Sequence, residues 1–120
     1  MRKQLSKDFY ADEFECPDSG LMNMDPEFIK LLQRIRTTAN IPFTITSGSR
    51  SPAHNFEVGG KPNSAHLRGL AVDIEALTSK ARFTIIDSAL LYGIPRIGVG
   101  KTFVHLDDDD SLPVGVIWIY

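Results

Sequence analysis

Residues that could bind a metal ion lie in and just before one short apolar segment. His66 lies in the sequence SAHLRG at 64–69, and Asp73 follows seven residues later among alternating apolar residues. A carboxylate within such a strand is costly to bury unless it is paired or coordinates a metal ion. The alternative is that the face of the strand that carries Asp73 and Glu75 is exposed to water. A third ligand is needed to favour the metal interpretation.

His105 is the candidate third ligand. In the segment FVHLD at 103–107, side chains alternate between the two faces of a strand, which places His105 and Asp107 on one face. If this strand lies beside the one with Asp73, both candidate ligands project from the same face of a sheet, and His66 lies at its edge. Two imidazoles and one carboxylate leave one tetrahedral position of a zinc ion open, as in catalytic zinc sites. Bound zinc lowers the pKa of its water to about 7, which provides a nucleophile at neutral pH.

The elements that position these residues can be predicted from the periodicity of apolar residues. Asp25 and Pro26 are typical of a helix start, and Asn40 follows the last residue of the helical pattern. Alternation of apolar and polar residues predicts the strands. Helices are predicted at 26–39, 52–56 and 79–91, and strands are predicted at 43–46, 70–74, 97–99, 103–106 and 116–120.

The length and composition favour a single domain. The chain has 120 residues, of which 42% are hydrophobic and 23% are charged, as is usual for a soluble globular protein. This length allows a substantial core, and one domain over residues 1–120 is expected. Strands outnumber helices and are separated by tight turns. The sequence therefore predicts an α+β fold with a small, largely antiparallel sheet flanked by helices.

Charge and cysteine content exclude several classes of protein. The net charge of −2 gives no basic surface, so no nucleic-acid partner is expected. The single cysteine, Cys16, excludes an intrachain disulfide and a cysteine-based zinc finger. No apolar run approaches the roughly 20 residues of a membrane span. The basic N-terminus lacks the apolar core of a Sec signal peptide. A monomer without a membrane span is expected.

Four motifs occur in order along most of the chain. They are SGSRSPAHN at 47–55, VGG at 58–60, SAHLRGLAVDI at 64–74 and FVHLD at 103–107. Together they resemble the M15 zinc peptidases, and most closely a small group named for the catalytic domain of D-Ala-D-Ala carboxypeptidase, common in phages and prophages. The resemblance implies the fold that these peptidases share with the hedgehog signalling domain, so the fold alone does not establish catalysis.

The resemblance also implies a zinc-dependent peptidase with one zinc ion per chain. Its ligands would be His66, Asp73 and His105. Arg50 would contact the substrate and stabilise the oxyanion of the scissile carbonyl, and Ser64 would lie near the substrate. The implied substrate is the stem peptide of bacterial peptidoglycan, cleaved at a D-Ala-D-Ala or an L-Ala-D-Glu bond. The expected location is the cytoplasm, or the cell wall for a phage-derived enzyme that another protein releases.

The chain departs from the family pattern at the position of the general base. Several branches carry Glu or Asp three residues before the last zinc histidine, where this chain has Thr102. Asp107 is the expected replacement, either as a base for the zinc-bound water or as a group that orients a ligand. His54 is a further candidate beside the substrate, and could equally be a structural residue that pins its loop. The alternative function is a non-catalytic zinc-containing module that binds a peptide or protein partner.

Three other features receive structural interpretations. The acidic run at 107–110 lacks the ligand spacing of a calcium loop and is expected to be a solvated turn. Trp118 and Tyr120 are expected to pack in the core with the last strand, although they could line a substrate groove. Cys16 is expected to be a partly buried thiol without a partner, at a position where relatives sometimes carry a cysteine pair.

Overall fold

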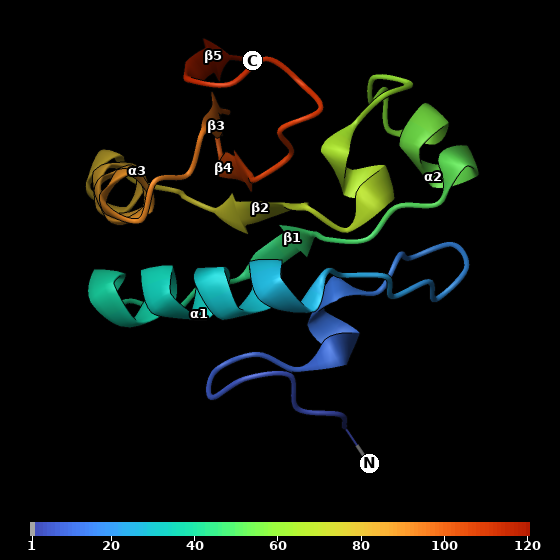
Figure 1. The fold of residues 1–120 in the computed structure, drawn as a ribbon, viewed down its shortest axis with the longest axis horizontal. Helices are drawn as coiled ribbons and strands as arrows, with labels where there is room; N and C mark the ends of the chain where they lie inside the picture. The colour runs from blue at the N-terminus through green and yellow to red at the C-terminus, as the bar shows by residue number, and fades with distance from the viewer. Residues whose placement is uncertain (1) are drawn as a thin grey trace.

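The computed structural model describes residues 2–120 and forms a mixed α+β fold around one sheet (Figure 1). Short 3₁₀ segments occur at Ala11–Phe14 (η1) and Ala65–Arg68 (η2). The helices are α1 (Pro26–Ala39), α2 (Pro52–Glu57) and α3 (Ser79–Leu91). The strands are β1 (Ile45–Ser47), β2 (Ala71–Glu75), β3 (Arg96–Val99), β4 (Phe103–Asp107) and β5 (Val116–Ile119).

The sheet has the strand order β1-β2-β4-β3-β5. Every neighbouring pair is antiparallel except β3 and β5, which are parallel. This arrangement confirms the predicted α+β class with a largely antiparallel sheet. In the part of the chain described, no helix is both long and apolar enough to cross a membrane.

The two faces of the sheet have different surroundings. Val72 and Ile74 of β2 and Val104 and Leu106 of β4 are fully buried in a core that also contains apolar residues of α1 and α3. Figure 1 shows α1 running along one side of the sheet, with α3 seen end-on beside it. Side chains alternate along each strand, so the residues between these apolar positions point to the opposite face.

Helix α1 begins and ends as its sequence predicts. The carboxylate of Asp25 accepts hydrogen bonds from the backbone N–H groups of Glu27 and Phe28, and Pro26 occupies the first turn. Asn40 ends the helix in the left-handed conformation, with φ of 54°. The inner face of the helix is apolar and buried, at Phe28, Ile29, Leu32 and Ile35.

Helix α2 also begins as predicted. Ser51 accepts a hydrogen bond from the N–H of His54, and Pro52 is the first helical residue. Helix α3 starts at the predicted Ser79, with Thr78 as its N-cap. The first strand is shorter than the predicted 43–46. It begins at Ile45, two residues after the predicted start, and its pairing with β2 is irregular between Ile45 and Ser47.

The prediction that the last strand packs in the core is wrong. In β5, Ile117 is 57% exposed and Ile119 is 85% exposed. The physical reason is that β5 is an edge strand with β3 as its one neighbour. Trp118 is half-buried, and Tyr120 just beyond the strand is exposed, so both remain available to a cavity on this face of the sheet.

Candidate metal centre

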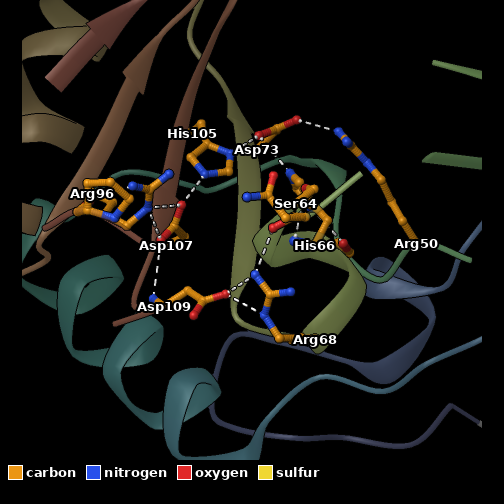
Figure 2. A network of polar contacts seen from close by, with 12 residues as sticks. Arg50, Ser64, His66, Arg68, Asp73, Arg96, His105, Asp107 and Asp109 are labelled. Carbon is orange, nitrogen blue, oxygen red and sulfur yellow. Dashed lines mark hydrogen bonds and ion pairs between the residues drawn. The ribbon is translucent and has the colours of Figure 1, made fainter. Parts of the chain in front are cut away.

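The strand register brings two of the predicted ligands together. Asp73 of β2 lies directly opposite His105 of β4. The Oδ1 atom of Asp73 lies 2.9 Å from Nδ1 of His105 and 3.3 Å from Nε2 of His66 (Figure 2). All three residues are buried, and their candidate ligand atoms lie within 4.8 Å of one another. The structure therefore places the predicted histidine–aspartate–histidine set in one cluster.

His66 is oriented by the backbone around it. Ser64 caps η2 by accepting a hydrogen bond from the N–H of His66, and Gly69 ends η2 in the left-handed region, with φ of 71°. The Nδ1 atom of His66 lies 2.8 Å from the carbonyl oxygen of Gly48. A carbonyl can only accept, so Nδ1 donates this bond. In the neutral ring, Nε2 then presents a lone pair toward Asp73.

His105 is oriented by a carboxylate. Its Nε2 lies 2.6 Å from Oδ2 of Asp107, which leaves Nδ1 directed at Asp73. Asp107 is in turn held by the guanidinium of Arg96, whose Nε lies 2.9 Å from Oδ1, and by the backbone N–H of Asp109. Metal-binding histidines characteristically donate their second ring nitrogen to a carboxylate or a backbone carbonyl. Both His66 and His105 have such a partner.

The electrostatics of the cluster favour a bound cation. Burial raises the pKa of Asp73, but the hydrogen bonds with His105 and His66 outweigh burial and hold this pKa well below its usual range. Burial lowers the pKa of His66. Burial also lowers the pKa of His105, but hydrogen bonds to Asp107 and Asp73 outweigh it and leave the pKa raised. The ionised carboxylate of Asp73 thus faces the neutral ring of His66. A lone pair on each points at the other, so a proton or a metal ion is needed between them.

The donor chemistry fits zinc. Two imidazole nitrogens and one carboxylate oxygen are ligands that zinc accepts in open, catalytic sites. The hard cations calcium and magnesium prefer oxygen donors instead. His66, Asp73 and His105 would therefore hold a zinc ion with one position left for water or substrate.

Arg50 lies against this cluster. One of its terminal nitrogens, Nη2, lies 3.3 Å from Oδ2 of Asp73. Its Nε donates to the hydroxyl of Ser47 at 3.0 Å, and its Nη1 donates to the side-chain carbonyl of Asn55 at 3.1 Å. The arginine side chain is 12% exposed. These contacts fix the orientation of the guanidinium, whose positive charge lies at the edge of the cluster.

A cavity of about 870 Å³ opens above the cluster. Arg50, Ser64 and the three candidate ligands line it, so the structure brings these predicted site residues together. Trp118 and Tyr120 line it as well, which corrects their assignment to the core. Further lining residues add positive charge and aromatic surface, at Lys61, Arg96 and Phe103.

Thr102 and His54 lie away from the cavity, and Asp107 lines it without facing the candidate metal position. Thr102 is exposed and does not line the cavity. His54 does not line it either, and a ring nitrogen of His54 lies instead near Cys16 and Asp18. Asp107 lines the cavity, but its carboxylate is held by Arg96 and by the nitrogen of His105 that faces away from Asp73. This geometry fits the orienting role left open for Asp107 in the sequence.

The prediction of a solvated acidic turn at 107–110 is wrong for two of its four residues. Asp107 is 1% exposed and Asp109 is 2% exposed, whereas Asp108 and Asp110 are exposed. The reason is that arginines face the buried carboxylates. Arg96 lies opposite Asp107 in the ladder between β3 and β4, and Nε of Arg68 donates to Asp109 at 2.6 Å.

Arg96 is a site residue that was not predicted from the sequence. The available signal was the alternation within 96–99, which places Arg96 and Gly98 on one face of a strand. That signal becomes informative only with the register, which sets Arg96 opposite Asp107 and Gly98 opposite His105.

Comparison with known proteins identifies the family of this chain. A sequence model of the peptidase M15 family matches residues 4–107. The chain belongs to the peptidase M15 family. The M15 match includes His66, Asp73, His105 and Asp107, and residues 108–120 lie beyond it. No curated protein sequence matches the chain.

A similar fold occurs among solved structures. The crystal structure of the L-Ala D-Glu endopeptidase ChiX of Serratia marcescens superposes with a TM-score of 0.53 and 20% sequence identity. The match covers 72% of this M15 chain and 81% of ChiX. At this identity the likeness concerns the fold, and it agrees with the mixed α+β architecture described above.

Proposed function

We propose that this M15 protein is a zinc-dependent peptidase that cleaves stem peptides of bacterial peptidoglycan. The observation that carries the proposal is the convergence of His66 Nε2, His105 Nδ1 and the Asp73 carboxylate beneath an open cavity. Each imidazole is oriented by a second partner, which is the arrangement that a metal site requires.

The three convergent residues would hold the zinc ion. When bound, zinc supplies a Lewis acid and lowers the pKa of water at the open position. Asp73 contributes the negative charge of the ligand set, and the hydrogen bond from His66 to Gly48 fixes the neutral ring in the orientation needed for binding.

Arg50 is proposed as the electrostatic catalyst. Its guanidinium is held by Ser47 and Asn55 at the edge of the cavity, so it does not have to reorganise during the reaction. A fixed donor directed at a developing oxyanion stabilises the transition state more than the ground state. Ser64 lines the same cavity and is proposed to contact the substrate backbone.

Asp107 is proposed as a positioning residue rather than a base. Its carboxylate accepts a hydrogen bond from Nε2 of His105 and pairs with Arg96. This contact orients His105 and increases the basicity of the ring nitrogen that faces Asp73. A role as base would require one of these oxygens to leave its partners and reach the other side of the ring.

The charge of the cavity supports an anionic peptide substrate. In the described part of the chain, three cationic side chains line it, those of Arg50, Lys61 and Arg96, against two carboxylates, Asp73 and Asp107, which pair with Arg50 and Arg96 respectively. The cationic groups of the lining therefore outnumber its carboxylates. Stem peptides carry free carboxylates on D-Glu and at their ends, which such a cavity would attract. The similar fold of an L-Ala D-Glu endopeptidase favours this bond as the first to test, with D-Ala-D-Ala as the second.

A non-catalytic zinc-containing module remains the second candidate. The observation that favours it is the exposed position of Thr102, outside the cavity, where several branches of the family carry an acid. A module of this kind would bind zinc and a peptide without cleaving the peptide.

The test is zinc analysis followed by product analysis. The purified protein is loaded with zinc and incubated with peptidoglycan fragments and synthetic stem pentapeptide, and products are identified by mass spectrometry. Cleavage after L-Ala or release of D-Ala, lost on chelation and in His66→Ala, supports the proposal. Stoichiometric zinc without cleavage supports the binding module. Failure to bind zinc would overturn both candidates.

A further inference from the structure

A second group of metal-ligand side chains lies outside the cavity, where the loop before α1 meets the start of α2. The candidate ligand atoms of Cys16, Asp18 and His54 lie within 4.8 Å of one another. The Sγ atom of Cys16 lies 2.8 Å from Oδ1 of Asp18. Among the residues that the structure describes, this is the one such group besides His66, Asp73 and His105.

Ser51 connects the members of this second group. Its hydroxyl donates to Oδ2 of Asp18 at 2.8 Å and lies 3.8 Å from Sγ of Cys16, and its backbone N–H donates to the same sulfur at 3.4 Å. The side chain of His54 is 17% exposed, and Cys16 is 1% exposed. The group therefore has a buried floor formed by the thiol and an open side formed by Asp18.

The close contact of sulfur and carboxylate needs a positive centre. A distance of 2.8 Å is shorter than the sum of the van der Waals radii of sulfur and oxygen. The thiol proton can lie between the two atoms as a hydrogen bond. A metal ion can also lie there, because a thiol that coordinates a metal ion loses its proton. The hydrogen bonds from Cys16 and Ser51 also lower the pKa of Asp18, which keeps this carboxylate ionised.

We propose that Cys16, Asp18 and His54 form a second site for a zinc-type divalent metal ion. Thiolate, imidazole and carboxylate are three donors that zinc accepts, and the thiolate disfavours calcium and magnesium. The hydroxyl of Ser51, which lies 3.8 Å from Sγ of Cys16, would supply a fourth donor. The site would tie the loop at 16–20 to the start of α2.

This position gives the second site a structural purpose. Ser51 directly follows Arg50, the residue proposed to stabilise the oxyanion. The backbone N–H of Ser49, on the other side of Arg50, donates to the carbonyl of Phe14 at 2.9 Å. The chain around Arg50 is thus attached on both sides to the N-terminal segment, and a metal ion at Cys16 would strengthen one of these attachments.

Cobalt substitution tests the second site independently of catalysis. Because Cys16 is the single cysteine, a thiolate-to-cobalt charge-transfer absorption band reports on this site alone. We expect wild-type protein to bind about two cobalt ions per chain and to show the band. The variant His66→Ala should lose one ion and keep the band, whereas Cys16→Ser should lose one ion and the band.

Substitutions at two less buried positions provide a test if the Cys16→Ser variant does not fold. Asp18→Asn and His54→Gln alter the open side of the site and leave the buried thiol in place. Both should weaken the band at a given cobalt concentration and should increase the rate of Cys16 alkylation in the presence of zinc. Asp110→Asn, at an exposed position outside this group, is the control and should leave the band unchanged.

The outcomes separate this proposal from the proposed function. Wild-type protein that binds a single cobalt ion, with no charge-transfer band and with unprotected Cys16, would overturn the second site and leave the peptidase proposal intact. A band that persists in His66→Ala protein without any peptidase activity in the wild type would support the second site and count against the proposed function.

Discussion

Asp73 and His105 lie directly opposite each other on β2 and β4, with Asp73 Oδ1 at 2.9 Å from His105 Nδ1. Their contact is a property of the strand register. A slip of one residue would turn Asp73 into the helix-covered core and bring Val72 or Ile74 to the cavity face. The apolar residues that alternate with Asp73 thus fix the position of the candidate metal ligand as well as the core.

Asp107→Asn tests whether Asp107 orients His105 or acts as a base. We expect the zinc affinity or the activity of the variant to fall by about 10- to 100-fold. The reason is that a neutral amide replaces the charged carboxylate that accepts the hydrogen bond from His105. Zinc affinity is measured by competition with a chromophoric chelator. A loss of activity with unchanged zinc affinity and an altered pH profile would instead assign the base role. Asp110→Asn, at an exposed position of the same run, is the control.

Arg50→Lys tests the electrostatic role of the guanidinium. Lysine keeps the charge but cannot contact Ser47, Asn55 and Asp73 with a planar fork. We expect kcat to fall by about 10²- to 10³-fold, with zinc content retained. Steady-state kinetics on a stem peptide provides the measurement, with the exposed Arg34→Lys as control. Unchanged kcat would remove Arg50 from the catalytic residues.

Asp109 should stabilise the fold in a pH-dependent manner. Burial raises the pKa of Asp109, but hydrogen bonds from Ser111 and Arg68 outweigh it and hold the pKa in the folded state below its usual value. The stabilisation is therefore present above about pH 4 and is lost as the pH falls through the lowered pKa.

The variant Asp109→Asn checks this prediction. It should lower the free energy of unfolding at pH 7 and have a smaller effect at pH 2 to 3, as measured by urea denaturation. Asp110→Asn should show no such difference, because Asp110 is exposed. Equal destabilisation by Asp109→Asn at both pH values would contradict the electrostatic explanation.

Gly69→Ala should disturb the turn that carries His66. Gly69 has φ of +71°, and a Cβ atom there would lie 2.0 Å from the carbonyl oxygen of Asn23. The matched control is Gly59→Ala, where φ is +76° and nothing lies within 4 Å of the added atom. We expect the control to cost about 1 to 2 kcal/mol from its left-handed backbone and Gly69→Ala to cost more, as measured by urea denaturation. Equal costs would show that the Asn23 backbone can move.

The sequence predicted the helix starts because their signals are local. Asp25, Ser51 and Thr78 cap helices through contacts within three residues. The candidate ligands could be found for a related reason, since Asp73 and His105 interrupt apolar alternation. Arg96 and Asp109 could not be assigned, because their partners depend on tertiary packing, with Arg68 lying 41 residues before Asp109. Alternation also could not show that β5 is an edge strand whose Ile117 and Ile119 are exposed.

The segment beyond the M15 match has an evolutionary consequence. Residues 108–120 contribute Leu112, Trp118 and Tyr120 to the cavity, but none of the three candidate metal ligands of that cavity. Nη1 of Arg96 donates to the carbonyl of Pro113 at 2.5 Å, and β5 pairs with β3, so this segment is attached through backbone contacts that tolerate many side chains. Mutation there can therefore alter the lining of the cavity while the candidate metal ligands stay under separate selection.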